Sequence, residues 1–153
     1  MPGRDPLFAP WSDASLGDPV LVRTIDGRPS YWLVPVERDG RAIGFMRISL
    51  AGEVEAAGVR YRDPRRLETA PALVTGIDAG EAAARAAAAV PGGDPVGEAI
   101  YVHDGPPGRE AWMVRLRDAS DAPRIVFVTP GGTYERGAAG MPGIEGGAEP
   151  PGR

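Results

Sequence analysis

Apolar and polar residues alternate between Ala111 and Arg117, which is the period-two pattern of a strand with one covered face. A polar turn follows, and a second apolar run, Ile125–Val128, ends before Pro130. Residues 111–135 therefore predict a β-hairpin. Similar strand patterns lie earlier, bounded by glycine-containing turns, at Val20–Ile25, Tyr31–Val36 and Ile43–Ile48.

The segment Tyr31–Val36 contains Pro35, whose nitrogen carries no hydrogen for a β-ladder. We expect this strand to lie at a sheet edge or to be bulged at Pro35. An exposed strand there is a place where an extended segment of a partner can add to the sheet.

Residues 77–90 predict the one clear helix of the chain. Asp78 is the expected N-cap and Glu81 follows three residues later, as in a capping box. Pro91 and two glycines end the segment. The interior is almost entirely alanine, which has the best helix propensity but buries little area, so we expect the helix to pack closely on a sheet.

Two parts of the chain repeat one order of features: Asp26-Gly27 corresponds to Asp104-Gly105, and Tyr31–Val34 to Ala111–Val114. This repetition indicates a duplication, with a chance agreement of two β-meanders as the alternative. We predict an α+β fold of two tandem antiparallel β-meander units, with the Ala-rich helix packed on the sheet of the second unit. The expected segments are an N-terminal arm (1–17), a first β-meander unit (18–59), an Arg-rich connector (60–71), a second helix-plus-meander unit (72–137) and a disordered tail (138–153).

The order of helix, strand and hairpin over residues 77–136 resembles the PepSY family of small α+β modules. The resemblance depends on Ala82–Val90, Ile100–Val102, Trp112–Val114 and Ile125–Gly132. The chain departs from the family at Pro130-Gly131-Gly132, where relatives usually have Asp-x-x-Thr-Gly, and the first unit lacks a preceding helix. The resemblance implies a non-enzymatic binding or inhibitory module and identifies no site residue.

Composition excludes several kinds of chemistry. The chain has no Cys, Lys, Asn or Gln, which excludes disulfides, cysteine metal sites and a Schiff-base lysine. A net charge of -4 argues against a general nucleic-acid binder. The sequence has neither a membrane-spanning apolar run nor a signal-peptide region, so the default expectation is a cytoplasmic protein. A trimmed form of an exported protein would have the same sequence.

Residues suited to catalysis are few. His103 is the only histidine, and nothing near the serines resembles a nucleophile elbow. Asp118–Asp121 offers oxygens for Ca²⁺, but a calcium loop needs about six ligands, so an ordinary turn is favoured. We predict no catalytic residue, no cofactor and no metal site.

Two groups of residues are candidates for binding. An anionic partner is one interpretation of the basic cluster, because guanidinium groups bind carboxylate and phosphate well; a solvated connector is the other. Aromatic residues in the two hairpins are expected first in the core and second as partner contacts. The basic cluster is Arg60, Arg62, Arg65 and Arg66, and the aromatic candidates are Tyr31, Trp32 and Trp112.

The favoured function is a non-catalytic binding or inhibitory module, PepSY-like, that engages a protein or peptide, with no nucleic acid and no membrane span. One alternative is a small cone-shaped α+β enzyme or ligand-binding protein with a pocket between helix and sheet. In the enzyme, Glu37 or Asp26 would act as acid or base. A structural subunit that closes a homodimer is a third alternative.

Overall fold

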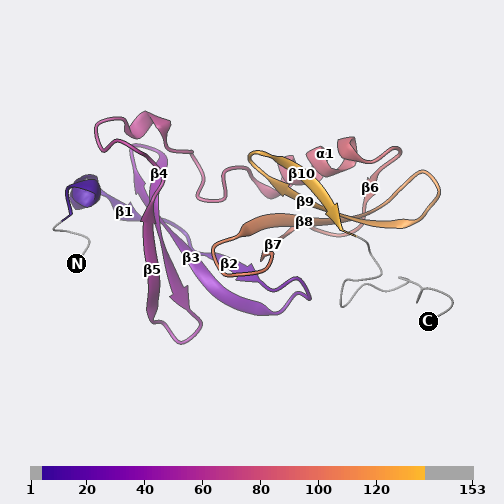
Figure 1. The fold of residues 1–153 in the computed structure, drawn as a ribbon, viewed down its shortest axis with the longest axis horizontal. Helices are drawn as coiled ribbons and strands as arrows, with labels where there is room; N and C mark the ends of the chain where they lie inside the picture. Colours follow the sequence, from indigo (N-terminus) through magenta and orange to yellow (C-terminus); the bar gives the residue numbers. More distant parts are fainter. Residues whose placement is uncertain (1–4, 137–153) are drawn as a thin grey trace. The chain divides into compact units, whose positions relative to one another are not determined.

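The computed structural model describes residues 5–136, of which 43% lie in strands and 17% in helices (Figure 1). The α+β prediction is therefore wrong, because the described chain is mainly β. Only residues 81–89 form an uninterrupted run of good helix formers, whereas glycine, proline and alternating apolar residues favour strands and turns elsewhere. The tail predicted for 138–153 lies outside the described residues.

Ten strands, one α-helix and two 3-10 helices make up the described chain. In order they are η2 (Pro6–Asp13), β1 (Ser15–Leu16), β2 (Val20–Arg23), β3 (Pro29–Arg38), β4 (Arg41–Ser49), β5 (Val54–Val59), η3 (Leu67–Thr69), α1 (Ala79–Ala89), β6 (Asp94–Pro95), β7 (Ile100–His103), β8 (Glu110–Arg117), β9 (Pro123–Thr129) and β10 (Gly132–Arg136).

Contacts divide the described chain into two compact units. The first comprises residues 5–22 and 30–76, and the second comprises 23–29 and 77–136. The expected arm and the Arg-rich connector thus group with the first unit, while the turn at residues 23–29 groups with the second.

Strands β3, β4 and β5 of the first unit form an antiparallel meander, and β1 pairs with the other side of β3. Pro35 therefore lies in an inner strand, so of the two predicted alternatives, a sheet edge or a bulge, the edge is wrong. The strand is irregular next to it, with a register shift between Val36 and Glu37. A partner strand cannot add at Pro35, because β1 and β4 occupy both sides of β3.

Helix η2 packs on the first unit through Leu7 and Trp11, which contact a core cluster that includes Val36 and Ile43. Gly44 makes this contact possible, since a Cβ at that position would lie 2.5 Å from the Trp11 ring. Within the predicted N-terminal arm, residues 6–13 form a 3-10 helix.

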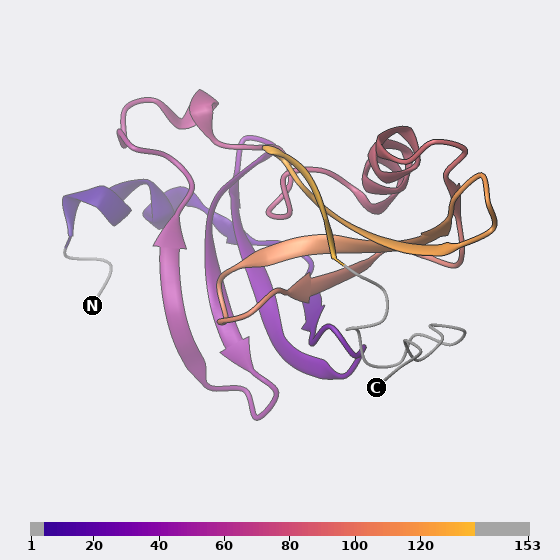
Figure 2. The same ribbon diagram turned by 45° about the vertical axis from the view of Figure 1, so that its right-hand side comes forward.

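Helix α1 of the second unit begins as predicted, with the Asp78 side chain accepting a hydrogen bond from the Glu81 amide at 2.7 Å. The helix lies on one face of the strands of its unit (Figures 1 and 2). Ala82 and Ala86 are completely buried there. The small side chains leave the bulk of the cluster to its other members, Ile77, Val90, Val114, Leu116, Val126 and Val128.

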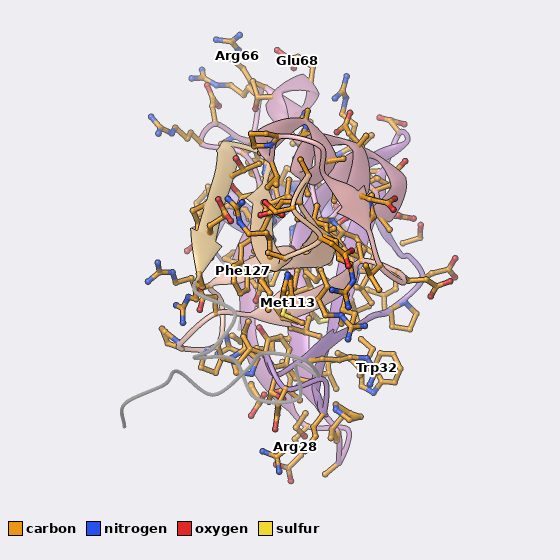
Figure 3. The ribbon with its side chains drawn as sticks, turned by 90° about the vertical axis from the view of Figure 1, so that its right-hand side faces the viewer. Arg28, Trp32, Arg66, Glu68, Met113 and Phe127 are labelled. Carbon is orange, nitrogen blue, oxygen red and sulfur yellow. The ribbon has the colours of Figure 1, made fainter. Side chains whose placement is uncertain are left out.

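The opposite face of β8 and β9 is also covered, which differs from the single covered face that the alternation predicts. Met113 and Phe127 lie together in this second cluster (Figure 3). The ring of Tyr134 from β10 stacks on Phe127 at a centroid distance of 5.1 Å. The sequence does not predict strand β10, which begins after the end of the second apolar run at Pro130.

The two units repeat one strand order. A short strand, β1 or β6, pairs with the long strand β3 or β8, and two further antiparallel strands follow in each case. The duplication remains a prediction with which this order agrees. A parallel contact between Arg23 and Val102 in the second unit is not part of the predicted antiparallel plan.

Replacing Trp112 tests the packing of α1. Its indole N–H donates to the Ile77 carbonyl at 2.9 Å, and its ring packs against the cluster beneath α1. We expect Trp112→Ala to lower the free energy of unfolding by about 3 to 5 kcal/mol, and Trp112→Phe, which loses the hydrogen bond and part of the ring packing, by about 1 to 2 kcal/mol. Denaturant unfolding followed by circular dichroism measures both values. An alanine variant as stable as the native chain contradicts the core role.

Candidate functional site

An open depression of about 540 Å³ lies in the first unit where β5 ends. Three of the four arginines of the predicted basic cluster border it, so the fold brings together most of a site that the sequence only suggested. We call it the arginine depression, and its lining residues are Val59, Arg60, Tyr61, Arg62, Asp63, Arg66 and Thr69.

The three arginines are held in different ways. The Arg60 guanidinium lies 4.7 Å from the centre of the Phe45 ring, and its Nε has no hydrogen-bond partner among the described residues. Arg66 pairs with Glu68 at 3.3 Å, and both side chains extend from the surface (Figure 3). Arg62 is exposed and forms no ion pair within residues 5–136. The arrangement leaves positive charge available to a ligand.

Arg65 does not line the arginine depression and instead pairs with Asp63. Its side chain is 89% exposed and pairs with Asp63 at 3.1 Å, while its amide donates to the same carboxylate at 2.9 Å. These bonds lower the pKa of Asp63, so that carboxylate stays ionised near neutral pH. Because Arg65 already neutralises Asp63, the acidic residue cancels little of the charge of the other arginines.

The connector that carries these residues is fastened to β4. Tyr61 is buried and its hydroxyl donates to the Leu7 carbonyl of η2 at 2.6 Å; burial raises the pKa of this hydroxyl. Arg41 donates to the Ala70 carbonyl and the Ala42 amide to the Pro71 carbonyl, both at 2.8 Å. The loop therefore has fixed points at each end of the depression.

The aromatic candidates are placed differently from one another. Tyr31 is only 2% exposed and lies beneath the Arg47 guanidinium, so it presents no contact surface. Trp112 is half-buried, donates to the carbonyl of Ile77 and packs against the cluster beneath α1. Trp32 is half-buried and points away from the ribbon, so of the three it retains the clearest contact surface (Figure 3).

The two carboxylates of the alternative enzyme belong to different units, Asp26 to the second and Glu37 to the first. Asp26 accepts a hydrogen bond from Thr24 and pairs with Arg28 at 2.9 Å. The Thr24 bond, more than the arginine, lowers the pKa of Asp26, which makes it a poor proton donor near neutral pH. Glu37 borders a separate open depression of about 490 Å³, with Asp13, Arg38 and Asp39. The expected pocket between helix and sheet is filled by the apolar cluster beneath α1.

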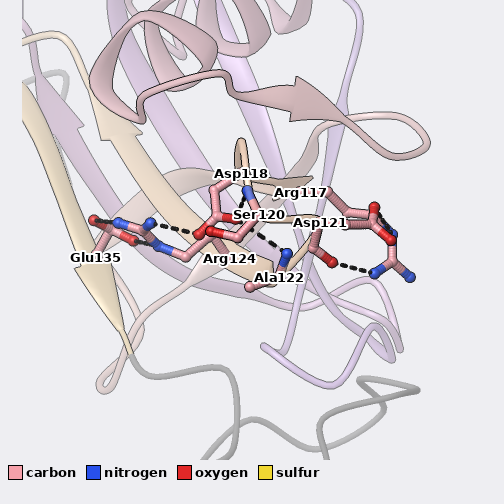
Figure 4. Close-up of polar contacts among 7 residues, drawn as sticks. All are labelled: Arg117, Asp118, Ser120, Asp121, Ala122, Arg124 and Glu135. Atoms are coloured by element: carbon pink, nitrogen blue, oxygen red, sulfur yellow. Dashed lines mark hydrogen bonds and ion pairs between the residues drawn. The ribbon is translucent and has the colours of Figure 1, made fainter.

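The turn between β8 and β9 uses its polar groups internally (Figure 4). The Asp118 carboxylate accepts hydrogen bonds from the amides of Ser120 and Ala122, at 2.8 and 3.0 Å, and from Arg124 at 3.0 Å. Arg124 also forms two bonds to Glu135, at 2.6 and 2.8 Å. The hydrogen bonds that Asp118 accepts, with the one from the Ala122 amide contributing most, lower the pKa of its carboxyl. The oxygens of Asp118 are therefore engaged in stabilising the turn.

The second unit contains a buried carboxylate, Asp104, with two partners that the sequence did not indicate. Asp104 is 1% exposed; it accepts a hydrogen bond from the Tyr134 hydroxyl at 2.6 Å and pairs with Arg136. Burial, then the bond to Asp104, raises the pKa of Tyr134 to about 12. No sequence signal links Asp104 to residues that lie about thirty positions later, because β10 was not expected.

Comparison with models of known protein families, with curated proteins and with solved structures finds no match. Within residues 5–136, no cluster of three or more acidic, histidine or cysteine side chains is arranged to hold a metal ion. None of the helices in this range has the length and apolar character needed to cross a bilayer.

Alkaline pH tests the cluster around Asp104. The pKa of Tyr134, about 12, lies above the ordinary value of 10.0, so the folded state holds this proton more tightly than the unfolded state. Its contribution to stability is complete below pH 10 and is lost as the pH rises towards about 12. Because the chain lacks lysine and cysteine, tyrosines are the only side chains that titrate in this range.

We expect Tyr134→Phe to show a smaller loss of unfolding free energy across this range than the native chain. Tyr61, whose pKa is also raised, contributes to the remaining loss. Denaturant unfolding at successive pH values, with tyrosinate absorbance as a second readout, measures the difference. Identical slopes for the two proteins contradict the raised pKa.

Proposed function

We propose that this protein is a non-catalytic binding module that engages an acidic segment of a protein or peptide partner at the arginine depression. The observation that carries the proposal is that Arg60, Arg62 and Arg66 border one open depression. Of these, Arg62 is exposed and has no acidic partner among the described side chains.

The chemistry of the lining favours carboxylate or phosphate groups. A guanidinium presents several N–H donors in a planar fork that matches either anion. The Phe45 ring holds the Arg60 guanidinium in place, which lowers the entropy lost when a ligand is bound. The positive charge is local, because the whole chain has a net charge of -4.

The same lining favours binding over catalysis. A general acid or base works best with a pKa near the working pH and must reach the substrate. Asp63 is held ionised by Arg65, and the Tyr61 hydroxyl is engaged with the Leu7 carbonyl. The PepSY resemblance implies the same class of function, a binding or inhibitory module.

A pair of matched double variants tests the proposal. We expect Arg62→Ala/Arg66→Ala to weaken binding of a glutamate-rich peptide about tenfold, since two charge-assisted contacts of modest strength are lost. Titration calorimetry at low salt measures the affinity, and added salt should weaken binding by the native protein because the site is open.

The control is Arg28→Ala/Arg117→Ala, which changes the net charge equally in the second unit. Both control arginines are exposed and pair with acidic residues of their own turns, Asp26 and Asp121. We expect this variant to bind the peptide as the native protein does. Equal losses in the two double variants, or no binding of the peptide by the native protein, contradict the proposal.

A further inference from the structure

Strand β5 presents an unpaired edge beside the arginine depression. Within the part of the chain that the structure describes, β4 is its only strand neighbour, and the sheet order ends at β5. The strand continues directly into Arg60, so the free edge and the positive charge adjoin each other along the chain.

The register shows which main-chain groups face the free edge. The Arg60 amide donates to the Ile43 carbonyl, so these two residues form a hydrogen-bonded pair. In an antiparallel ladder such pairs alternate with pairs whose N–H and C=O groups point away. Ala57 lies opposite Met46, and Val59 opposite Gly44, in this second kind of pair. The amide and carbonyl groups of Ala57 and Val59 therefore face outward.

The two ends of β5 differ in how well a further strand can pair with them. At the start, a register shift leaves Glu55 as an extra residue, and such bulges commonly protect an edge from pairing. Between Ala57 and Val59 the register is regular. Gly58 belongs to this part, where a Cβ would lie 2.7 Å from the Phe45 ring that supports Arg60.

We infer that the partner binds as an extended strand on the outer edge of β5, hydrogen-bonded to Ala57 and Val59, with its acidic side chains entering the arginine depression. This inference rests on the proposed function and adds the conformation of the partner. Main-chain bonds supply affinity in such strand addition, and side-chain contacts supply specificity.

The charges along β5 indicate which end of the strand the acidic residues of the partner lie beside. Glu53 and Glu55 lie at the start of the strand, and Arg60 and Arg62 follow its end. Like charges directly opposite each other destabilise a strand pair, whereas opposite charges stabilise it. The acidic residues of the partner therefore belong beside Arg60 and Arg62, and the segment that passes Glu53 and Glu55 has no acidic residue.

A second copy of this chain fits the edge less well. Antiparallel pairing of two β5 strands places opposite charges near each other, but six residues with a bulge offer less than the roughly 1,000 Å² expected for a stable interface between folded proteins. A flexible segment can also follow the connector into the arginine depression. The test below includes the second copy as an outcome.

A proline at position 57 removes the outward N–H without removing a bond to β4. We expect Ala57→Pro to weaken binding of the glutamate-rich peptide about tenfold or more, whereas Ala57→Val, which keeps the N–H, binds as the native protein does. Inorganic phosphate needs only the arginines, so its affinity should be equal in the native protein and both variants. Equal phosphate affinity also shows that the proline leaves the site folded.

A second measurement uses the native protein alone, so it does not depend on how the proline variant folds. Glutamate-rich peptides methylated on alternate backbone nitrogens should fall into two sets, because only alternate amides of an added strand bond to its neighbour. We expect methylation in one register to weaken binding about tenfold and in the other register to leave it unchanged.

The outcomes separate this inference from the proposed function. If the native protein does not bind the peptide, the proposed function fails and the inference fails with it, whether or not phosphate binds. If the peptide binds, and neither methylation register nor Ala57→Pro weakens its binding, the inference fails and the proposed function stands. A native dimer in sedimentation that Ala57→Pro dissociates assigns the edge to a second copy and overturns the inference.

Discussion

The burial of Tyr61 is the contact on which the candidate site depends. The residue leaves the end of β5, enters the core of the first unit and donates its hydroxyl to the Leu7 carbonyl. A buried hydroxyl without an acceptor is costly, so this bond also secures η2 against the strands. With Tyr61 turned inward, its neighbours Arg60 and Arg62 border the depression.

Charge placement then distinguishes a usable site from an ordinary charged connector. Arg65 and Asp63 neutralise each other, and Arg66 is partly compensated by Glu68. Exposed ion pairs of this kind contribute little stability. Arg62 has no such partner in the described chain, and Arg60 is positioned by an aromatic ring. The cluster is therefore partly prepared for an anion.

The second unit contains a buried charged group, in contrast to the open arginines of the first unit. Asp104 is removed from solvent and is balanced by Tyr134 and Arg136, both from the last described strand. A buried carboxylate without such partners would lose far more solvation than its neighbours return. The arrangement stabilises the return of β10 onto β9, whereas the open arginines of the first unit remain available for contact.

Local patterns in the sequence were sufficient for the helix and most strands. The capping residues and alanines of 78–90 specify a helix from neighbours alone, and the alternation over 111–117 specifies β8 in the same way. The sequence also pointed to the arginines of the connector. Each of these depends on propensities and spacings within a few residues, which can be read without knowing what lies across the sheet.

Only the tertiary structure decided the balance of the fold and the composition of the site. The mainly β content, the inner position of Pro35 and the strand β10 depend on pairing between distant residues. The separation of Arg65 from the other three arginines depends on how the connector turns around the buried Tyr61. Contacts of this kind are chosen by packing and burial over the whole unit, and local sequence carries no direct record of them.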